Sequence, residues 1–294
     1  MIVTTRQRRL DSKVMFEFTR MPLRVMRVPS HGAYTVQHSH DFNELVIIVD
    51  GHGKHAVGPE SYRLEAGDVF VILKDTSHGY PETENLSLIN ILFDPEQLRI
   101  PQSDVADLPG YHALFAVEPH LRSQGRFRNH FRLAPEELVE VSEIVSELEE
   151  ELVERRGAYR FMAIGHLMML IGFLARSYSD VKLSHTKPVA QISRLLSYLN
   201  ANYAQPLNVS DLTEFAHMSQ SSLMRTFGEF TGRSPIDYLI RLRVTRAAHL
   251  LVTTPLRVTE ISEVVGFEDS NYFARQFKRI QGISPREYRR GRAS

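Results

Sequence analysis

The sequence has no cysteine among its 294 residues. It therefore forms no disulfide, thiolate metal site or cysteine nucleophile, which fits a reducing compartment. The N-terminus lacks an apolar core of signal-peptide length, and glycine and histidine interrupt the longest apolar stretch, residues 161–175. Because a bilayer span needs about 20 apolar residues, we expect a soluble cytoplasmic protein.

Motifs of two enzyme classes are also missing. The sequence has no Gly-x-Ser-x-Gly nucleophile turn, and Gly51, Gly53 and Lys54 lack the glycine spacing and the Ser/Thr of a phosphate-binding loop. Hydrolase and NTPase functions therefore have no support, and we assign no catalytic residue.

The net charge of the whole chain is zero, but basic and acidic residues are unevenly distributed along it. Lys plus Arg number 35, as do Asp plus Glu. From Pro188 onward there are 14 basic and 9 acidic residues, whereas the preceding residues hold 21 and 26. The C-terminal third is thus basic, a charge asymmetry that favours a nucleic-acid partner for that part.

Residues from about 22 to 93 contain short apolar runs separated by turn residues. The runs include residues 45–49, 69–73 and 88–92, and Gly, Pro, Asp and Asn lie between them. This pattern predicts an antiparallel β-barrel or sandwich.

The apolar period then changes to three and four residues over about 135–178. The first predicted helix has Leu138, Val141, Val145, Leu148 and Leu152 on its inner face. The second has Phe161, Ile164, Met168, Ile171, Ala175 and Tyr178. Such a helix pair can pack on the barrel, on itself or on a second subunit, and we expect packing on the barrel together with a homodimer. The polar residues 179–188 form a predicted linker.

The C-terminal third contains an internal repeat at an offset of 50 residues. Its clearest matches are Gly232 with Gly282, Ser234 with Ser284, Pro235 with Pro285, Tyr238 with Tyr288, Arg225 with Arg275 and Phe227 with Phe277. Each copy predicts a first helix capped by Ser210 or Thr259, a turn, and a second helix starting near Ser219 or Asp269. Both copies are therefore interpreted as helix-turn-helix units.

The second helix of each unit has a polar face suited to the DNA major groove. The residues expected to bind DNA are Ser221, Arg225 and Thr226 in the first unit and Asp269, Asn271, Arg275, Lys278 and Arg279 in the second. Arg grips guanine and Asn grips adenine with paired hydrogen bonds, whereas Lys278 and Arg279 suit phosphates. A long helix from Pro235 to about residue 252 connects the units, and its arginines 241, 243 and 246 are either phosphate contacts or a solvated face. The alternative is a pair of helical modules for protein contacts.

Residues 189–290 resemble the DNA-binding domain of the AraC/XylS family of transcription regulators. The resemblance rests on Arg243, Ala247, Leu250 and Leu251, followed by Ile261, Gly266, Phe267, Asn271, Tyr272, Phe273, Arg275 and Phe277. It implies a seven-helix domain that binds promoter DNA at two major-groove segments and commonly activates transcription by touching RNA polymerase. Val264 departs from the alanine usual in the family, which requires slight repacking.

The N-terminal part carries a second constellation, His38, His40, Glu44 and the later His78. Alternation along a strand directs His38 and His40 to one side, and Glu44 follows at an even spacing. The set allows a metal-dependent cupin enzyme, a polar lining for a small hydroxylated ligand, or hydrogen-bonded structural histidines. We expect these four residues to bind a ligand, and we assign no metal or cofactor.

The first cupin motif is matched in spacing by Gly32, His38, His40, Glu44 and Gly51. The second motif is imperfect, with Leu73, Asp75 and Glu82 where cupins usually have Pro, Gly and Asn. The segments 38–47 and 86–93 resemble the rhamnose-responsive regulators of the AraC/XylS family, which implies L-rhamnose or a related deoxysugar as the effector.

The sequence as a whole predicts an α+β protein of two domains. Residues 1–178 form a cupin-like sensor with its helix pair, and residues 189–290 form an all-α domain of two helix-turn-helix units. The predicted function is a cytoplasmic, sugar-responsive transcription regulator, most simply an activator. The alternative is a metal-dependent cupin isomerase or dioxygenase with a regulatory DNA-binding tail.

Overall fold

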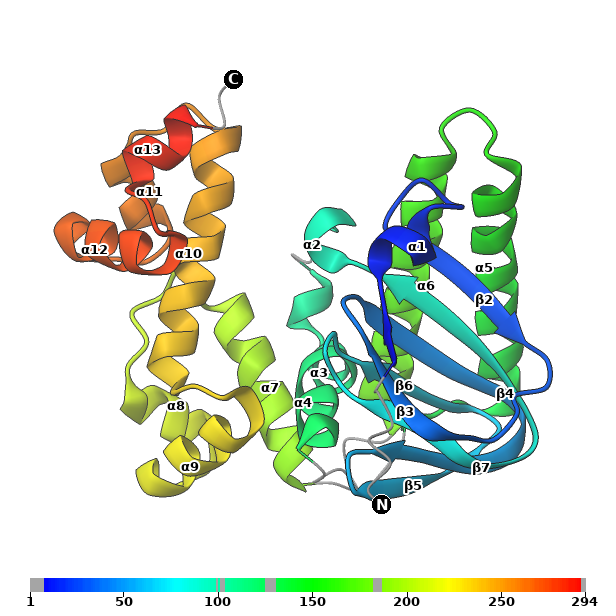
Figure 1. Cartoon of the computed structure of the whole chain (residues 1–294). Coiled ribbons are helices and arrows are strands. Elements are labelled where there is room, and N and C mark those ends of the chain that lie inside the picture. The colour runs from blue at the N-terminus through cyan, green and yellow to red at the C-terminus, as the bar shows by residue number, and fades with distance from the viewer. Residues whose placement is uncertain (1–7, 99, 101–103, 125–130, 182–186, 292–294) are drawn as a thin grey trace, which may run out of the picture. The chain divides into compact units, whose positions relative to one another are not determined.

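The computed structural model describes residues 8–98, 100, 104–124, 131–181 and 187–291 (Figure 1). The chain divides into two compact units, residues 1–190 and 191–294. Of the expected linker 179–188, residues 182–186 lie outside the described residues, whereas the helix before it continues to Val181 and the next begins at Lys187.

The first unit combines a sheet with helices. Its strands are β1 (Arg8–Leu10), β2 (Leu23–Val28), β3 (Tyr34–His40), β4 (Asn43–Val57), β5 (Glu60–Glu65), β6 (Asp68–Ile72), β7 (His78–Phe93) and β8 (Phe131–Arg132). Its helices are α1 (Ser12–Phe16), α2 (Pro95–Leu98), α3 (Pro109–His112), α4 (Glu118–Ser123), α5 (Pro135–Glu154) and α6 (Tyr159–Val181), with a 3-10 turn at Val105–Asp107 and a π turn at Ala113–Val117.

Two long strands, β4 and β7, form the centre of the sheet. Each pairs with different strands along its two halves. The first half of β4 pairs with β6 and its second half with β5. The start of β7 pairs with β3 and its end with β2, while β4 and β7 pair with each other along both halves. Every pair is antiparallel except β1 with β3.

Both long strands change direction at the same level. The pairing register shifts between Ile48 and His52, where Gly51 has φ +75°, and opposite it Asn85 has φ +50°. A Cβ on Gly51 would lie 2.2 Å from the carbonyl oxygen of Asn85. Only glycine permits both this close approach and a positive φ at no steric cost, so Gly51 fixes the bend.

One apolar cluster draws side chains from both halves of the bent sheet. It consists of Val46, Ile48, Leu64, Phe70, Ile72, Tyr80, Leu86 and Leu88. Burying each of the aliphatic and phenylalanine side chains contributes roughly 1.5–3 kcal/mol, which holds the sheet closed over this core. The sheet-rich N-terminal domain predicted from alternation and turn residues is thus confirmed.

The helix pair follows the predicted spacing, but the second stripe is rotated. On α5 the buried residues are Val141, Ile144, Val145, Leu148 and Leu152. On α6 they are Ala163, Leu167, Leu170, Ile171, Leu174, Ala175 and Tyr178, whereas Phe161 and Met168 are exposed. The predicted inner positions Phe161 and Met168 were therefore wrong, because several parallel apolar rows run along this helix and packing selects only one.

The prediction that no segment is long enough to span a bilayer was also wrong. Tyr159–Ser179 of α6 is apolar and long enough to cross a membrane by length and composition. Core helices of soluble proteins pass the same test, and α6 packs on α3 and α5. At Gly110 in α3 the backbone amide donates to Ser179 Oγ at 2.9 Å, a close approach that requires glycine.

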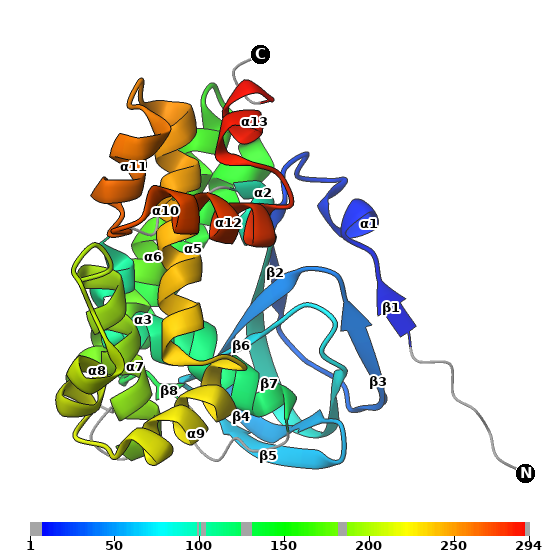
Figure 2. The ribbon, with the colours of Figure 1, turned by 90° about the vertical axis from the view of Figure 1, so that its left-hand side faces the viewer.

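The second unit is all-α. Its helices are α7 (Lys187–Ala201), α8 (Val209–Ala216), α9 (Gln220–Thr231), α10 (Pro235–Thr253), α11 (Val258–Val264), α12 (Ser270–Gln281) and α13 (Pro285–Arg290). Figures 1 and 2 show α8 and α9 at one end of α10, and α11, α12 and α13 at the other. This arrangement confirms the predicted helical domain and its repeated organisation.

The two copies have matching helix boundaries. Ser219 and Asp269 cap α9 and α12 by accepting backbone amide hydrogen bonds, and both helices end at glycines with positive φ. The first helices begin earlier than predicted, because Asn208 caps α8 and Arg257 precedes α11, in place of Ser210 and Thr259. The Asn208 side chain accepts from two backbone amides, which a residue inside the first turn cannot do.

Candidate effector site and DNA-binding interface

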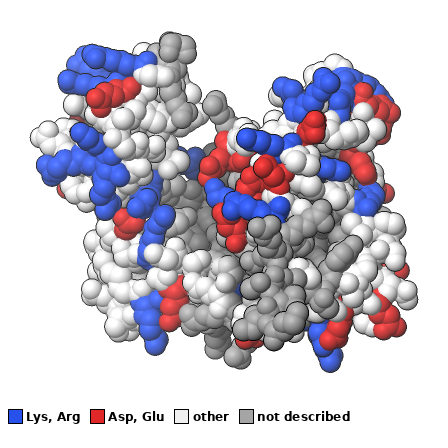
Figure 3. Space-filling view, in the orientation of Figure 1, with Lys and Arg blue, Asp and Glu red and all other residues white. Residues whose placement is uncertain are grey.

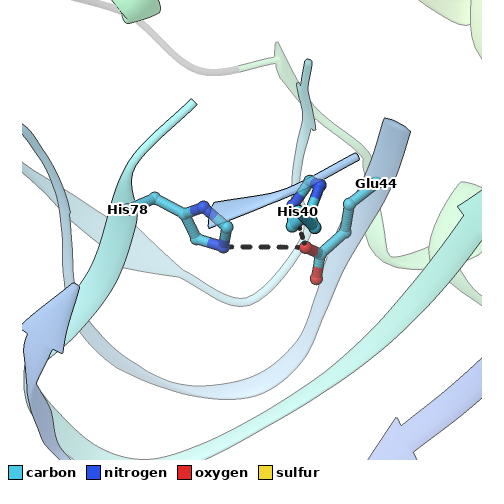
Figure 4. A group of neighbouring side chains, drawn as sticks. All are labelled: His40, Glu44 and His78. Carbon is cyan, nitrogen blue, oxygen red and sulfur yellow. Dashed lines mark ion pairs between the residues drawn. The ribbon is translucent and has the colours of Figure 1, made fainter. Parts of the chain in front are cut away.

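Three of the four predicted ligand residues meet inside the sheet of the first unit. His40 ends β3, Glu44 lies at the start of β4 and His78 begins β7, and their side chains converge in Figure 4. Glu44 Oε2 lies 3.0 Å from His40 Nε2 and 3.6 Å from His78 Nε2. The donor atoms lie within 4.8 Å of one another, and the three residues are 0 to 4% exposed.

The backbone fixes the orientation of both imidazole rings. His40 Nδ1 lies 2.7 Å from the carbonyl oxygen of Phe42, and His78 Nδ1 lies 3.2 Å from that of Thr76. A carbonyl only accepts, so both Nδ1 atoms donate, and both Nε2 atoms point toward Glu44. His40 Nε2 contacts Glu44 Oε2 at 3.0 Å, whereas His78 Nε2, at 3.6 Å, lies beyond hydrogen-bond distance of it.

The loop before His78, which contains the departures from the cupin pattern, is held by contacts of Asp75. Asp75, which stands where glycine is usual, has φ +65°, a conformation that aspartate tolerates better than most residues. Its backbone amide donates to the His40 carbonyl at 2.7 Å, and its carboxylate pairs with Arg9. The loop is thereby tied to β3, which directs His78 into the cluster.

Burial controls the protonation of this cluster. Burial lowers the pKa of His78 to about 4, against a smaller opposing effect of Glu44. Burial alone raises the pKa of the Glu44 carboxyl, but contact with His40 and the charge of His78 offset it, and the pKa lies below its ordinary value. At neutral pH the cluster therefore holds a carboxylate beside a neutral His78.

His38, the fourth predicted ligand residue, lies beside the group of three. It pairs with His78 across β3 and β7, and their ring centroids are 4.3 Å apart. Its ring is 6.4 Å from that of His40, and it does not belong to the group whose donor atoms converge. The spacing placed His38 on the correct side of the strand, but only the tertiary structure separates it from the other three.

A buried polar region next to the cluster was missed by the sequence analysis. The ring centroid of His55 lies 5.6 Å from that of His78 and 5.1 Å from that of Tyr80. His55 is eleven residues from Glu44, an odd spacing that simple alternation assigns to the opposite face. The register shifts within β4 change this parity, so no local pattern would have identified it.

The same interior contains a buried polar group contributed by helices, Glu118, Arg122 and Tyr178. The guanidinium of Arg122 in α4 lies 4.6 Å over the Phe70 ring, and the Tyr178 hydroxyl of α6 donates to Glu118. Burial raises the pKa of Glu118 to about 8, more than Tyr178 and Arg122 lower it. These residues join the interior of the sheet to the helix pair.

The second unit presents most of the predicted DNA-binding residues on its surface. Ser221, Arg225, Asn271, Arg275, Lys278 and Arg279 are exposed. Thr226 is 8% exposed and lies in the buried row with Phe227, which leaves little of its side chain accessible for the predicted DNA contact. Asp269 is exposed, but its side chain accepts from the amides of Asn271 and Tyr272 and caps α12.

The two recognition helices, α9 and α12, differ in charge. Basic side chains on α12 and α13 are Arg275, Lys278, Arg279, Arg286, Arg289 and Arg290. Figure 3 shows Lys and Arg gathered over these two helices. Arg275 also lies 5.8 Å over the ring of Tyr272, a contact with no counterpart at Ser222 in α9.

The arginines of α10 mainly support the fold. Arg243 donates to the carbonyls of Tyr203 and Gln205, and Arg246 donates to Asn200. Arg241 forms an ion pair with Asp237 at 2.9 Å. Arg243 and Arg246 thus join α10 to the end of α7 and the segment after it. Neither a phosphate contact nor a solvated face, the two expected alternatives, describes these two side chains.

The geometry defines a class of protein. A sheet with a buried polar cluster occurs on the same chain as two capped helix-turn-helix units whose second helices expose Arg and Asn. This combination defines a DNA-binding transcription regulator with its own sensor domain.

Comparison with known families agrees with this class. Residues 23–155 match the AraC-like ligand binding domain, and residues 212–291 match a helix-turn-helix domain. The chain belongs to the AraC family of transcription regulators. It is 31% identical over 256 residues to the HTH-type transcriptional activator RhaR of Escherichia coli K12 and of Shigella boydii serotype 4, covering 86% of each chain.

Solved structures resemble the second unit. The C-terminal domain of AraT from Geobacillus stearothermophilus is 34% identical, with 35% of this chain and 87% of that chain covered and a TM-score of 0.35. The DNA-binding domain of AdpA, solved with a target DNA, is 30% identical, with coverages of 34% and 91% and a TM-score of 0.33. The RhaR relatives, at 31% identity, are named transcriptional activators, which leaves the cupin isomerase or dioxygenase alternative without support.

Proposed function

We propose that this chain is a cytoplasmic, one-component activator that responds to a small carbohydrate, L-rhamnose or a related deoxysugar. The observation that carries this proposal is the buried polar group of His40, Glu44 and His78, with His38 beside it, on a chain with two helix-turn-helix units. Imidazole and carboxylate groups suit sugar hydroxyls, each of which donates and accepts a hydrogen bond. The similarity to proteins named RhaR supports rhamnose as the first sugar to test.

The effector acts by favouring one arrangement of the protein over another. The Glu118–Tyr178 hydrogen bond joins the wall of the sensor domain to α6, and thus provides a path from the effector to the helix pair. Exposed apolar side chains on that pair, Val139, Val153, Phe161 and Met169, support its use as a homodimer interface. DNA contact through α9 and α12 and contact with RNA polymerase complete the proposed mechanism.

The test is a thermal-shift screen of the full chain against monosaccharides in the presence of a chelator. A ligand that binds only the native state raises the unfolding midpoint by mass action. We expect a concentration-dependent rise with L-rhamnose or a close relative and no rise with unrelated sugars. The absence of any shift across the panel would contradict the carbohydrate proposal.

The site is tested with the double variant His40→Ala, Glu44→Gln. We expect it to lose the sugar-induced shift and to keep basal binding to promoter DNA, because the second unit folds around its own core. His52→Ala is the matched control, since His52 and Glu84 form a similar pair on the surface, with side chains 62% and 72% exposed. An unchanged sugar response in the double variant would exclude this site.

A further inference from the structure

One of the two arginines expected to read bases lies over an aromatic ring. Arg275 Cζ is 5.8 Å from the centroid of the Tyr272 ring, three residues earlier on α12. An arginine at this distance is attracted to the face of the ring. Both residues are exposed, and the Arg275 side chain takes part in no ion pair or hydrogen bond with a described residue. The ring contact is therefore what orients this guanidinium before DNA binds.

The Tyr272 ring is itself held by the core of the second unit. Its centroid lies 6.0 Å from that of Phe267, which is buried in the core cluster of this unit. The guanidinium of Arg243 lies 5.6 Å from the Phe267 ring, and hydrogen bonds to the carbonyls of Tyr203 and Gln205 fix it there. Arg275 thus lies on a ring that packs against fixed neighbours.

The first unit has no equivalent ring. At the offset of 50 residues, Ser222 stands where α12 has Tyr272, although Arg225 matches Arg275. Arg225 contacts no aromatic ring among the described residues. It therefore keeps its rotamer freedom until it meets DNA, and ordering it on a base costs conformational entropy. The two matched arginines differ in how far they are oriented in advance.

We propose that Tyr272 is a positioning residue for base recognition by Arg275. The second unit then discriminates its base more strictly than the first unit does, a consequence that rests on the DNA contact through α9 and α12 proposed above. Arginine recognises guanine with two hydrogen bonds, which requires a defined orientation of the guanidinium. A freely rotating arginine can contact a phosphate instead, and phosphates are present at every sequence. Holding Arg275 on the ring favours the base contact.

The test measures base preference by binding-site selection and by equilibrium binding of the full chain. Tyr272→Leu removes the aromatic face but keeps an apolar side chain, whereas Tyr272→Phe keeps the ring and removes only the hydroxyl. We expect Tyr272→Leu to lower discrimination at one base pair about two- to fivefold, as for an exposed cation–aromatic contact. Tyr272→Phe should leave it unchanged. Full discrimination in Tyr272→Leu would overturn the proposal, as would equal losses in both variants, which would indicate direct contact of the hydroxyl with DNA.

A reciprocal variant tests the same explanation in the first unit. Ser222→Tyr places a ring three residues before Arg225, and we expect discrimination at the base read by Arg225 to rise by a similar factor. Gln220→Tyr is the matched control, because side chains five residues apart on a helix are not neighbours. The absence of a gain in Ser222→Tyr, or an equal gain in the control, would contradict the role of the ring.

A double variant separates a positioning role from a structural one. If Tyr272 acts through Arg275, adding Tyr272→Leu to Arg275→Ala should reduce discrimination no further, and additive losses would overturn the proposal. Thermal unfolding of each variant monitors its folding. Lost preference in Arg275→Ala with full preference in Tyr272→Leu would reject the positioning role and retain the DNA contact. Unchanged preference in Arg275→Ala would reject the DNA contact of this residue itself.

Discussion

Asp237 in α10 is paired with Arg279 in α12, with Oδ1 and Nη2 3.0 Å apart. Its other carboxylate oxygen accepts from Arg241 at 2.9 Å. Asp237 thus connects α10, the helix between the two helix-turn-helix units, to α12, the recognition helix of the second helix-turn-helix unit. The charges of Arg241 and Arg279 also lower the pKa of Asp237, although burial alone raises it, so the carboxylate stays ionised.

We therefore predict that Asp237→Ala increases the salt-dependent binding of non-specific DNA. Each arginine released to contact a phosphate makes the slope of log K against log salt steeper by about 0.9. The measurement is fluorescence anisotropy at several salt concentrations. Glu214→Ala is the control, because Glu214 is an exposed acidic residue of α8 and its loss changes net charge equally. Equal effects of both variants would show that only total charge matters.

Arg225 and Arg275 occupy equivalent exposed positions on α9 and α12, and we expect both to contact bases. Arg225→Ala or Arg275→Ala should cost about 1–3 kcal/mol on the specific site and relax base preference at one position. Lys278→Ala should weaken all sequences alike, since a phosphate contact carries no sequence information. Binding-site selection with each variant measures the difference. An unchanged preference in both arginine variants would contradict the assigned face.

His112 makes the first unit sensitive to acid. Its ring is 4% exposed and bonded through Nε2 to the Ala106 carbonyl at 2.7 Å. Burial lowers the pKa of His112 from 6.5 to about 4, so the unfolded chain takes up this proton first. This histidine does not change the free energy of unfolding above pH 6.5. The free energy of unfolding then falls by about 3 kcal/mol as the pH drops toward 4.

The measurement is the free energy of unfolding between pH 4 and 7. We expect His112→Gln to reduce the acid-dependent loss, because glutamine does not titrate. His52→Gln, at an exposed histidine, should follow the unmodified chain. A pH profile of His112→Gln that is parallel to the unmodified one would refute the role of this residue.

Gly266 allows the turn between α11 and α12 to pack on the segment after α7. Its φ is +88°, and a Cβ there would lie 2.6 Å from the Ala204 carbonyl oxygen. Gly282 has a similar φ of +82° with open space around it. Gly282→Ala should therefore cost about 1 kcal/mol from backbone strain, and Gly266→Ala distinctly more, with weaker DNA binding. Thermal unfolding of both variants tests this order, and equal losses would argue against the steric explanation.

Much of the second unit could be predicted from the sequence because its determinants are local. The matched caps at Ser219 and Asp269, the glycines that end both helices and the apolar spacing around Phe227 and Phe277 act within a few residues. The exposed face followed directly, apart from Thr226, which lies at the border between the polar and buried rows. Arg243 and Arg246 were less predictable, since their partners are about 40 residues away.

In the first unit the sequence by itself determined the strands, the turns and the candidate residues His40, Glu44 and His78, because alternation and turn chemistry are local properties. Only the tertiary structure decided which side chains meet. The bend at Gly51 and the register shifts in β4 bring His55 inward. The pairing of β3 with β7 places His38 against the His78 ring, outside the group of three residues whose donor atoms converge. Packing likewise selected the buried row of α6 that includes Tyr178 and left Phe161 exposed. These outcomes depend on contacts between distant segments, whose geometry no local pattern encodes.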